Sequence, residues 1–231
     1  MNQAPSPDMG DAQDQAERPN RPAFFTNCMK QNYDLCMQQV LKTLEGKPRL
    51  LLHSCCGPCS SAVLEKLTPH FQVTVYFYNP CIHPAQEYEK RLSEQKRLIR
   101  EAELPVDILE APYDPESYFD LVKGLESAPE GGDRCLVCFR QRLMATAQAA
   151  KVHGFDYFTT TLTVSPHKNA ENLNRIGQEV SEEVGVPFLP ADFKKRSGYL
   201  RSLQLSAEYA LYRQDYCGCV YSRRDGNNKQ L

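Results

Sequence analysis

Segments rich in β-branched and aromatic residues alternate with helix-forming segments along most of this chain. The apolar run RLLLH at 49–53 is followed by a helix that begins near Pro58, and QVTVYFYN at 72–79 is followed by a long helical pattern over 85–103. This alternation is typical of a sheet with parallel strands and helices packed on its faces. The predicted fold class is therefore α/β, a mainly parallel sheet with helices on both faces.

The same alternation continues through the C-terminal half of the sequence. We predict strands at 105–111 and 155–164 and an extended piece at 186–193. The predicted helices lie at 114–125, within 129–154, at 169–185 and at 199–213. In sheets of this kind, ligands collect at the carboxyl ends of the strands.

The ends of the chain differ in composition from the rest. Residues 1–22 are polar, acidic and proline-bearing, and 223–231 are short and basic. We predict a disordered tail, a single α/β catalytic domain at 23–222, and a flexible C-terminal tail. The sequence contains neither a secretory signal nor an apolar run of membrane-spanning length, so we expect no membrane partner.

Ten cysteines in a chain without a secretory signal indicate metal or redox chemistry in a reducing compartment, here expected to be the cytoplasm. Seven of them form three groups: Cys55-Cys56-x-x-Cys59, Cys135-x-x-Cys138 and Cys217-x-Cys219. Structural zinc, a redox dithiol and an iron–sulfur cluster all remain open. Four thiolates for a [4Fe–4S] cluster, with the others left for a second ion, use this set most completely.

Positive charge is concentrated towards the C-terminus. Residues 191–231 carry eight lysines and arginines against four acids, although the whole chain has a net charge of −2. This region is either a contact surface for a phosphate backbone or a solvated surface. Charge alone does not separate the two.

Several long motifs resemble the cobalamin-independent epoxyqueuosine reductases. They include LLHSCCGPCS at 51–60, VYFYNPCIHPAQEYEKRL at 75–92, GGDRCLVCFRQRL at 131–143 and LYRQDYCGCVYS at 211–222. The resemblance implies reductive removal of the epoxide of epoxyqueuosine at the tRNA wobble position. The products are an alkene, which completes queuosine, and water, formed with two electrons and two protons.

The resemblance also implies a [4Fe–4S] cluster, an adjacent iron or other divalent metal ion, an external electron donor, and a fold of the nucleotide α-hydrolase (HUP-like) group. By position, the cluster ligands are Cys56, Cys135, Cys138 and Cys217. The adjacent ion is matched by Cys55 and Cys219. Cys59 is a further metal-ligand candidate and stands where some relatives have an aspartate that completes the second site. Because Cys59 departs from that form, the third ligand of the ion is open between this thiolate, a water and another carboxylate.

Protons for the reaction need donors near the metal. Loops that follow strand ends face the site, which makes His167 and Lys168 candidates, and Tyr88 is a third if its side chain turns inward. His53 and His83 are further candidates. For each of them a plain structural role is equally consistent with the sequence.

Two other functions remain open at this point. One is a zinc-stabilised RNA-binding module without catalysis, and the other is an iron–sulfur tRNA thiolase of the ATP-pyrophosphatase type. The thiolase would need a glycine-rich phosphate loop after the first strand. This chain has HSCCGPCSS there, with a single glycine, which argues against ATP use.

Overall fold

The computed structural model describes residues 32–222. The tails predicted at 1–22 and 223–231 lie outside the described residues, and the domain limits of 23–222 stay a prediction. None of the helices within 32–222 combines the length and hydropathy that a membrane crossing requires.

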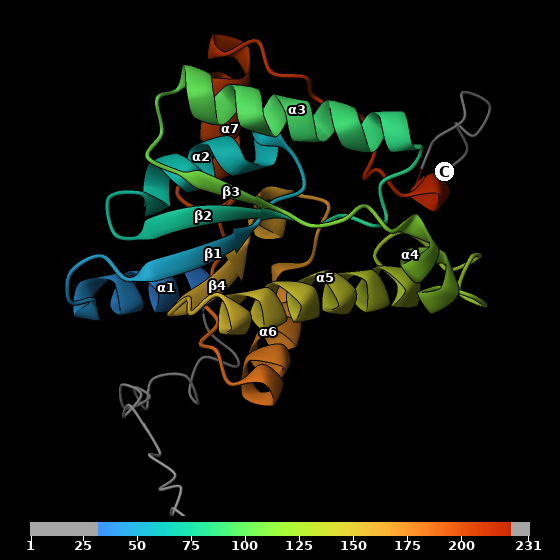
Figure 1. Ribbon diagram of the computed structural model, residues 1–231, viewed down its shortest axis with the longest axis horizontal. Coiled ribbons are helices and arrows are strands. Elements are labelled where there is room, and N and C mark those ends of the chain that lie inside the picture. Colours follow the sequence, from blue (N-terminus) through green and yellow to red (C-terminus); the bar gives the residue numbers. More distant parts are fainter. Residues whose placement is uncertain (1–31, 223–231) are drawn as a thin grey trace, which may run out of the picture.

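A four-stranded parallel sheet forms the centre of the molecule (Figure 1). Its strands are β1 (Arg49–His53), β2 (Gln72–Phe77), β3 (Asp107–Glu110) and β4 (Tyr157–Thr160). They lie in the order β3-β2-β1-β4, with β1 pairing in parallel to both β2 and β4. The predicted α/β class is confirmed.

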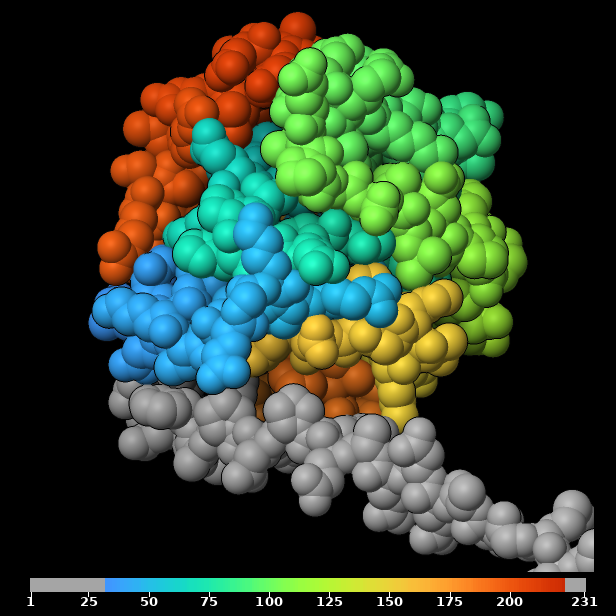
Figure 2. All heavy atoms as spheres, turned by 60° about the vertical axis from the view of Figure 1, so that its left-hand side comes forward, coloured from blue at the N-terminus to red at the C-terminus, as the bar shows by residue number. Residues whose placement is uncertain are grey.

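Helices cover both faces of this sheet. In Figure 1, α2, α3 and α7 lie above it, and α5 and α6 lie below it. The helices are α1 (Tyr33–Thr43), α2 (Gly57–Leu67), α3 (Ala85–Glu101), α4 (Pro115–Leu121), α5 (Asp133–Val152), α6 (Ala170–Val184) and α7 (Gly198–Glu208). Figure 2 shows the C-terminal part of the chain, in red, lying against α2 and α3.

The alternation of side chains along β1 explains why both faces need covering. Leu51 packs with residues of α5 and α6 in one apolar cluster, whereas Leu50 and Leu52 pack with α1 and α2 in another. All three are fully buried. A strand buried on both sides reads as a continuous apolar run, which is the pattern seen at 49–53.

Several predicted elements end earlier than the sequence indicated, among them the helix predicted at 114–125, which ends at Leu121. The strand expected over 155–164 stops at Thr160, and a 3-10 turn, η2 (Thr161–Val164), replaces its second half. Thr160 causes the change, because its hydroxyl accepts a hydrogen bond from the Leu162 backbone N–H at 3.1 Å. The helix expected over 199–213 ends at Glu208, so 209–213 begins a loop instead.

The strand order places a switch point between β1 and β4. The chain builds the sheet outward from β1 to β3 and then crosses back to add β4 on the other side of β1. At the carboxyl end of this pair, His53 lies opposite Thr160, and its Nδ1 is 2.9 Å from the threonine hydroxyl. Open parallel sheets bind ligands at such a point.

Candidate metal centre

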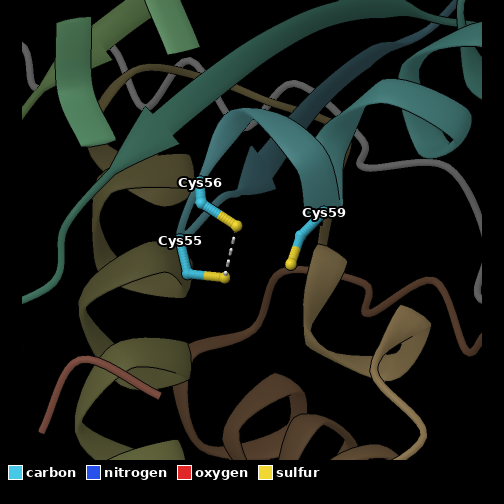
Figure 3. A group of neighbouring side chains, drawn as sticks. All are labelled: Cys55, Cys56 and Cys59. Atoms are coloured by element: carbon cyan, nitrogen blue, oxygen red, sulfur yellow. Dashed lines mark hydrogen bonds between the residues drawn. The ribbon is translucent and has the colours of Figure 1, made fainter. Parts of the chain in front are cut away.

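Cys55, Cys56 and Cys59 form a trio at the turn from β1 into α2. Cys56 is the N-cap of α2 and has an extended backbone, with Pro58 in the first helical turn. The three sulfurs lie within 4.8 Å of one another, and those of Cys55 and Cys56 are 3.8 Å apart. Figure 3 shows the three side chains pointing towards a common space.

These distances suit a shared metal ion. Two thiolates bound to one zinc ion at about 2.3 Å are about 3.8 Å apart in tetrahedral geometry. Thiolate donors also suit iron–sulfur clusters. Within residues 32–222, this trio is the only group of three metal-binding side chains that lie this close together.

The second cysteine group begins helix α5. The backbone N–H of Gly131 donates a hydrogen bond to the Cys135 sulfur at 3.2 Å, and Gly131 has a φ of +87° that favours glycine. Cys138, one turn further on, is buried. A helix N-terminus stabilises thiolates, because its free N–H groups and its dipole favour negative charge.

The third group, Cys217-Gly218-Cys219, is held by Arg91 of α3. The Arg91 Nη1 donates to the Cys217 carbonyl oxygen at 3.0 Å, and its Nε pairs with Glu87 at 2.6 Å. Gly218 has a φ of +108°, and a Cβ there would lie 2.9 Å from the Arg91 Nη1. The tight turn between the two cysteines therefore requires glycine.

The buried Tyr118 of α4 binds the last cysteine of this group. Its hydroxyl lies 2.9 Å from the Cys219 sulfur. Tyr118 and Cys219 share an apolar cluster with Cys138 and with Cys81, which follows β2. The nearby Cys138 thiol lowers the pKa of Cys81 to about 6. Cys81 and Tyr118 are thus two neighbours of the predicted ligands that the cysteine grouping did not reveal.

A glutamine connects the C-terminal loop to the trio. The Nε2 of Gln214 donates to the Cys56 sulfur at 3.0 Å across 158 positions of sequence. Figure 1 shows the start of α5 and the C-terminal segment at the same end of the sheet. The fold thus brings residues of all three cysteine groups towards the carboxyl end of β1, where the sequence places the first group. Within residues 32–222, only the sulfurs of the trio lie close enough together to bind a single metal ion. The division of the cysteine ligands between two metal centres stays a prediction.

A cavity of about 280 Å³ opens beside these thiols. Cys55, Cys59 and Cys217 form part of its lining, and the loop 164–168 after η2 forms another part. Tyr199 of α7 also lines it, beside a polar rim at 213–216. The cavity lies next to the metal-binding side chains and is polar and aromatic on its other sides.

His167 and Lys168 line this cavity, whereas Tyr88 does not. Burial opposes the charge of Lys168, but the neighbouring thiolates, Cys217 foremost, outweigh it and raise the lysine pKa. Lys168 therefore keeps its positive charge in the wall of the cavity near the thiols. Tyr88 donates from its hydroxyl to the Ala111 carbonyl oxygen at 3.3 Å.

The two further histidine candidates differ in their surroundings. His53 is fully buried, and its ring nitrogens bind the Thr160 hydroxyl and the Tyr78 carbonyl oxygen. Burial, helped by the charge of Arg142, lowers the pKa of His53 to about 4. His83 packs edge-on against Phe119, with ring centroids 5.7 Å apart. Neither lines the cavity.

The donors at this site fit an anionic, thiolate-bound group. The clearest sign is Arg142 of α5, which is fully buried and whose Nη2 has no hydrogen-bond partner within the described residues. The thiols of Cys138 and Cys55 lie near enough for their charges to act on it. A buried cation needs a compensating negative charge, and thiolates gathered on a metal centre supply one.

Comparison with known proteins shows the family to which the chain is similar. The family model described as "Epoxyqueuosine reductase QueH" matches residues 50–225. A relative with that name from Streptococcus pyogenes serotype M1 is 48% identical over 202 residues, which cover 84% of this chain and 79% of the relative.

Two further relatives carry the same name. The Staphylococcus epidermidis protein is 42% identical over 202 residues, covering 84% of this chain and 85% of the relative. The Thermotoga maritima protein is 36% identical over 184 residues, covering 78% and 93%. In each case the similarity extends over most of both chains.

Proposed function

Because the chain belongs to the epoxyqueuosine reductase QueH family, we propose that it removes the epoxide of epoxyqueuosine in tRNA and leaves queuosine. The family makes the chain an oxidoreductase. In the proposed reaction both C–O bonds of the epoxide break, a carbon–carbon double bond forms, and the oxygen leaves as water. Two electrons from an external donor and two protons balance the reaction. A substrate in tRNA is consistent with a cytoplasmic location.

The observation that carries this proposal is the thiol trio beside the cavity, with Cys55 and Cys59 in the cavity wall. We assign the [4Fe–4S] cluster to Cys56, Cys135, Cys138 and Cys217, and the adjacent ion to Cys55, Cys59 and Cys219. When bound, such a pair of centres supplies single electrons and a Lewis acid for the epoxide oxygen. Support for a thiolate-bound group here comes from the trio, whose sulfurs lie within 4.8 Å of one another, and from the uncompensated charge of Arg142. The division of the ligands between the two centres rests on the resemblance to the family.

The chain's own residues hold the substrate and supply protons. A cavity of about 280 Å³ is close to the lower limit of small-molecule sites, about 300 Å³. It therefore suits one modified base turned out of the anticodon loop. Lys168 lies beside the thiols and is charged, so it is the group best placed to protonate the leaving oxygen. His167, on the exposed side of the same loop, is the second candidate.

The basic residues near the C-terminus divide into two kinds. Lys194 pairs with Asp192 at 2.7 Å, and Arg196 pairs at 2.5 Å with Asp34, whose side chain is buried. Lys195, by contrast, is exposed and makes no ion pair with any residue in the range 32–222. We therefore assign phosphate contacts to Lys195 and a stabilising role to Arg196.

The test is anaerobic purification followed by iron and sulfide analysis and an assay on tRNA that carries epoxyqueuosine. With dithionite as the reductant, digestion and mass spectrometry should show queuosine replacing epoxyqueuosine. A zinc-containing, colourless protein without turnover would support the RNA-binding alternative. An iron–sulfur protein that leaves the epoxide intact would contradict the proposed reaction while keeping the metal assignment.

A further inference from the structure

Arg142 is a buried arginine without a carboxylate partner. It is among the largest fully buried side chains, and no ion pair within residues 32–222 includes it. Its Nε donates to the Cys138 carbonyl oxygen, one helical turn earlier, at 3.3 Å, and its Nη2 has no hydrogen-bond partner in the described structure. The guanidinium carbon lies 5.6 Å from the centre of the Phe139 ring.

Two other buried arginines show which partners a buried guanidinium has elsewhere in this fold. Arg91 pairs with Glu87 and donates to the Cys217 carbonyl oxygen. Arg134 donates to the Glu126 and Ala128 carbonyl oxygens. Arg134 also lacks an acid, and its Nε has no hydrogen-bond partner within the described residues, but its Nη1 donates to several carbonyl oxygens. Arg142 has one backbone acceptor and no acid, so its charge is the least compensated of the three.

The thiols of four cysteines from several elements lie near enough for their charges to act on Arg142, and Lys168 and His53 lie within its electrostatic reach as well. Cys138 belongs to its own helix, Cys81 follows β2, Cys217 lies in the C-terminal loop, and Cys55 follows β1. An isolated charge in an apolar interior is costly unless an opposite charge lies near it. A [4Fe–4S] core with four thiolates carries two net negative charges, and reduction adds one more.

We propose that Arg142 is the built-in counter-charge of the metal centre and that it raises the reduction potential of the bound cluster. The inference rests on the proposed function for the presence of that cluster. Arg142 is a positioning residue that acts through the electrostatic field and does not touch substrate. A fixed cation in a poorly polarisable interior favours the more negative, reduced state. It thereby makes the cluster easier to load with the electrons that the reaction consumes.

The experiment compares Arg142→Met, which removes the charge and keeps an unbranched side chain, with Arg142→Lys, which keeps the charge. The matched control is Arg140→Met on the same helix, because Arg140 is exposed and pairs with Glu183 and Glu179. The anaerobic holoproteins are titrated electrochemically, and the reduced cluster is followed by electron paramagnetic resonance.

At a fixed potential, Arg142→Met should show at least a tenfold lower ratio of reduced to oxidised cluster, which is a shift of about 59 mV for one electron. Arg142→Lys should shift less, and Arg140→Met should match the wild type. A fully loaded Arg142→Met protein with the wild-type potential would overturn the inference.

Thermal unfolding of the same variants covers the case in which Arg142→Met does not assemble the cluster. Without metal, Arg142→Met should melt at or above the wild-type temperature, because it lacks a buried charge. With metal, the wild type should be the more stable. A metal-free Arg142→Met protein that melts lower than the wild type would show a purely structural role and overturn the inference. Absence of iron from the wild type would instead overturn the proposed function as well.

Discussion

Replacing Tyr118 by Phe tests whether Cys219 binds a metal ion. The substitution removes one hydroxyl, 2.9 Å from the Cys219 sulfur, and leaves the buried ring in place. A hydrogen bond to a charged thiolate contributes about 1.5–3 kcal/mol, whereas one to a neutral thiol contributes about 0.5–1.5 kcal/mol. The larger value corresponds to roughly 10- to 100-fold in metal affinity, which is the usual effect of removing a group that hydrogen-bonds a metal ligand.

The assay measures iron retention. Anaerobically loaded protein is dialysed against increasing concentrations of a chelator, and iron per chain is compared with the visible absorbance of the cluster. In Tyr118→Phe, one iron should be lost at a roughly 10- to 100-fold lower chelator concentration than in the wild type. The cluster absorbance should persist, because Cys219 is assigned to the adjacent ion and not to the cluster.

Tyr113→Phe is the matched control. The Tyr113 hydroxyl donates to the Ile82 carbonyl oxygen at 2.7 Å, and the ring belongs to the same apolar cluster as Tyr118. Its loss should lower stability by about 0.5–1.5 kcal/mol and leave iron retention unchanged. If Tyr118→Phe and Tyr113→Phe retain iron equally, Cys219 is a neutral core thiol and the reasoning is refuted.

Two pairs of substitutions test the remaining assignments. Cys55→Ala should lose about one of roughly five iron atoms and keep the cluster spectrum, whereas Cys56→Ala should lose the cluster. Equal loss of iron and colour in both variants would refute the assignment of these two cysteines to different metal centres. Lys195→Ala should reduce the salt dependence of tRNA binding by about 0.7 in the slope of log K against log salt, with an unchanged melting temperature. Arg196→Ala should lower stability by about 1 kcal/mol or less, because Arg196 is partly exposed and Asp34 keeps its ion pair with Lys66 at 3.2 Å, and should leave that slope unchanged. A calorimetric melt and a salt titration of tRNA affinity distinguish the last two outcomes.

The sequence predicts the fold well where local chemistry decides the structure. Asp114 caps α4 by accepting from the Ser117 N–H at 3.2 Å, and Gly185 ends α6 in the left-handed conformation, as their residue types indicate. Thr160 shows the opposite case. Its β-branched side chain favours a strand, but its hydroxyl binds the backbone two residues further on and starts a 3-10 turn.

The candidate site also has a part that the sequence predicts and a part that it does not. Cysteines at strand ends can be recognised from sequence, because few residue types bind soft metals and parallel strands end at one edge. The groups around them can be any hydrogen-bond donor that the fold delivers. Tyr118 reaches Cys219 across 101 positions of sequence, and Gln214 reaches Cys56 across 158. No local pattern contains those contacts.

The environment of Arg142 can be predicted from the sequence only in part. Phe139, Leu143 and Ala147 mark the buried stripe of α5, and Cys138 and Arg142 lie on the flank of that stripe, four residues apart and both buried. A cation at a buried helix position has to meet a negative charge, since the interior solvates it poorly. The burial of Arg142 on this helix therefore favours an anionic group near Cys138. The identity of that group requires the other cysteine loops, which only the folded chain brings to it.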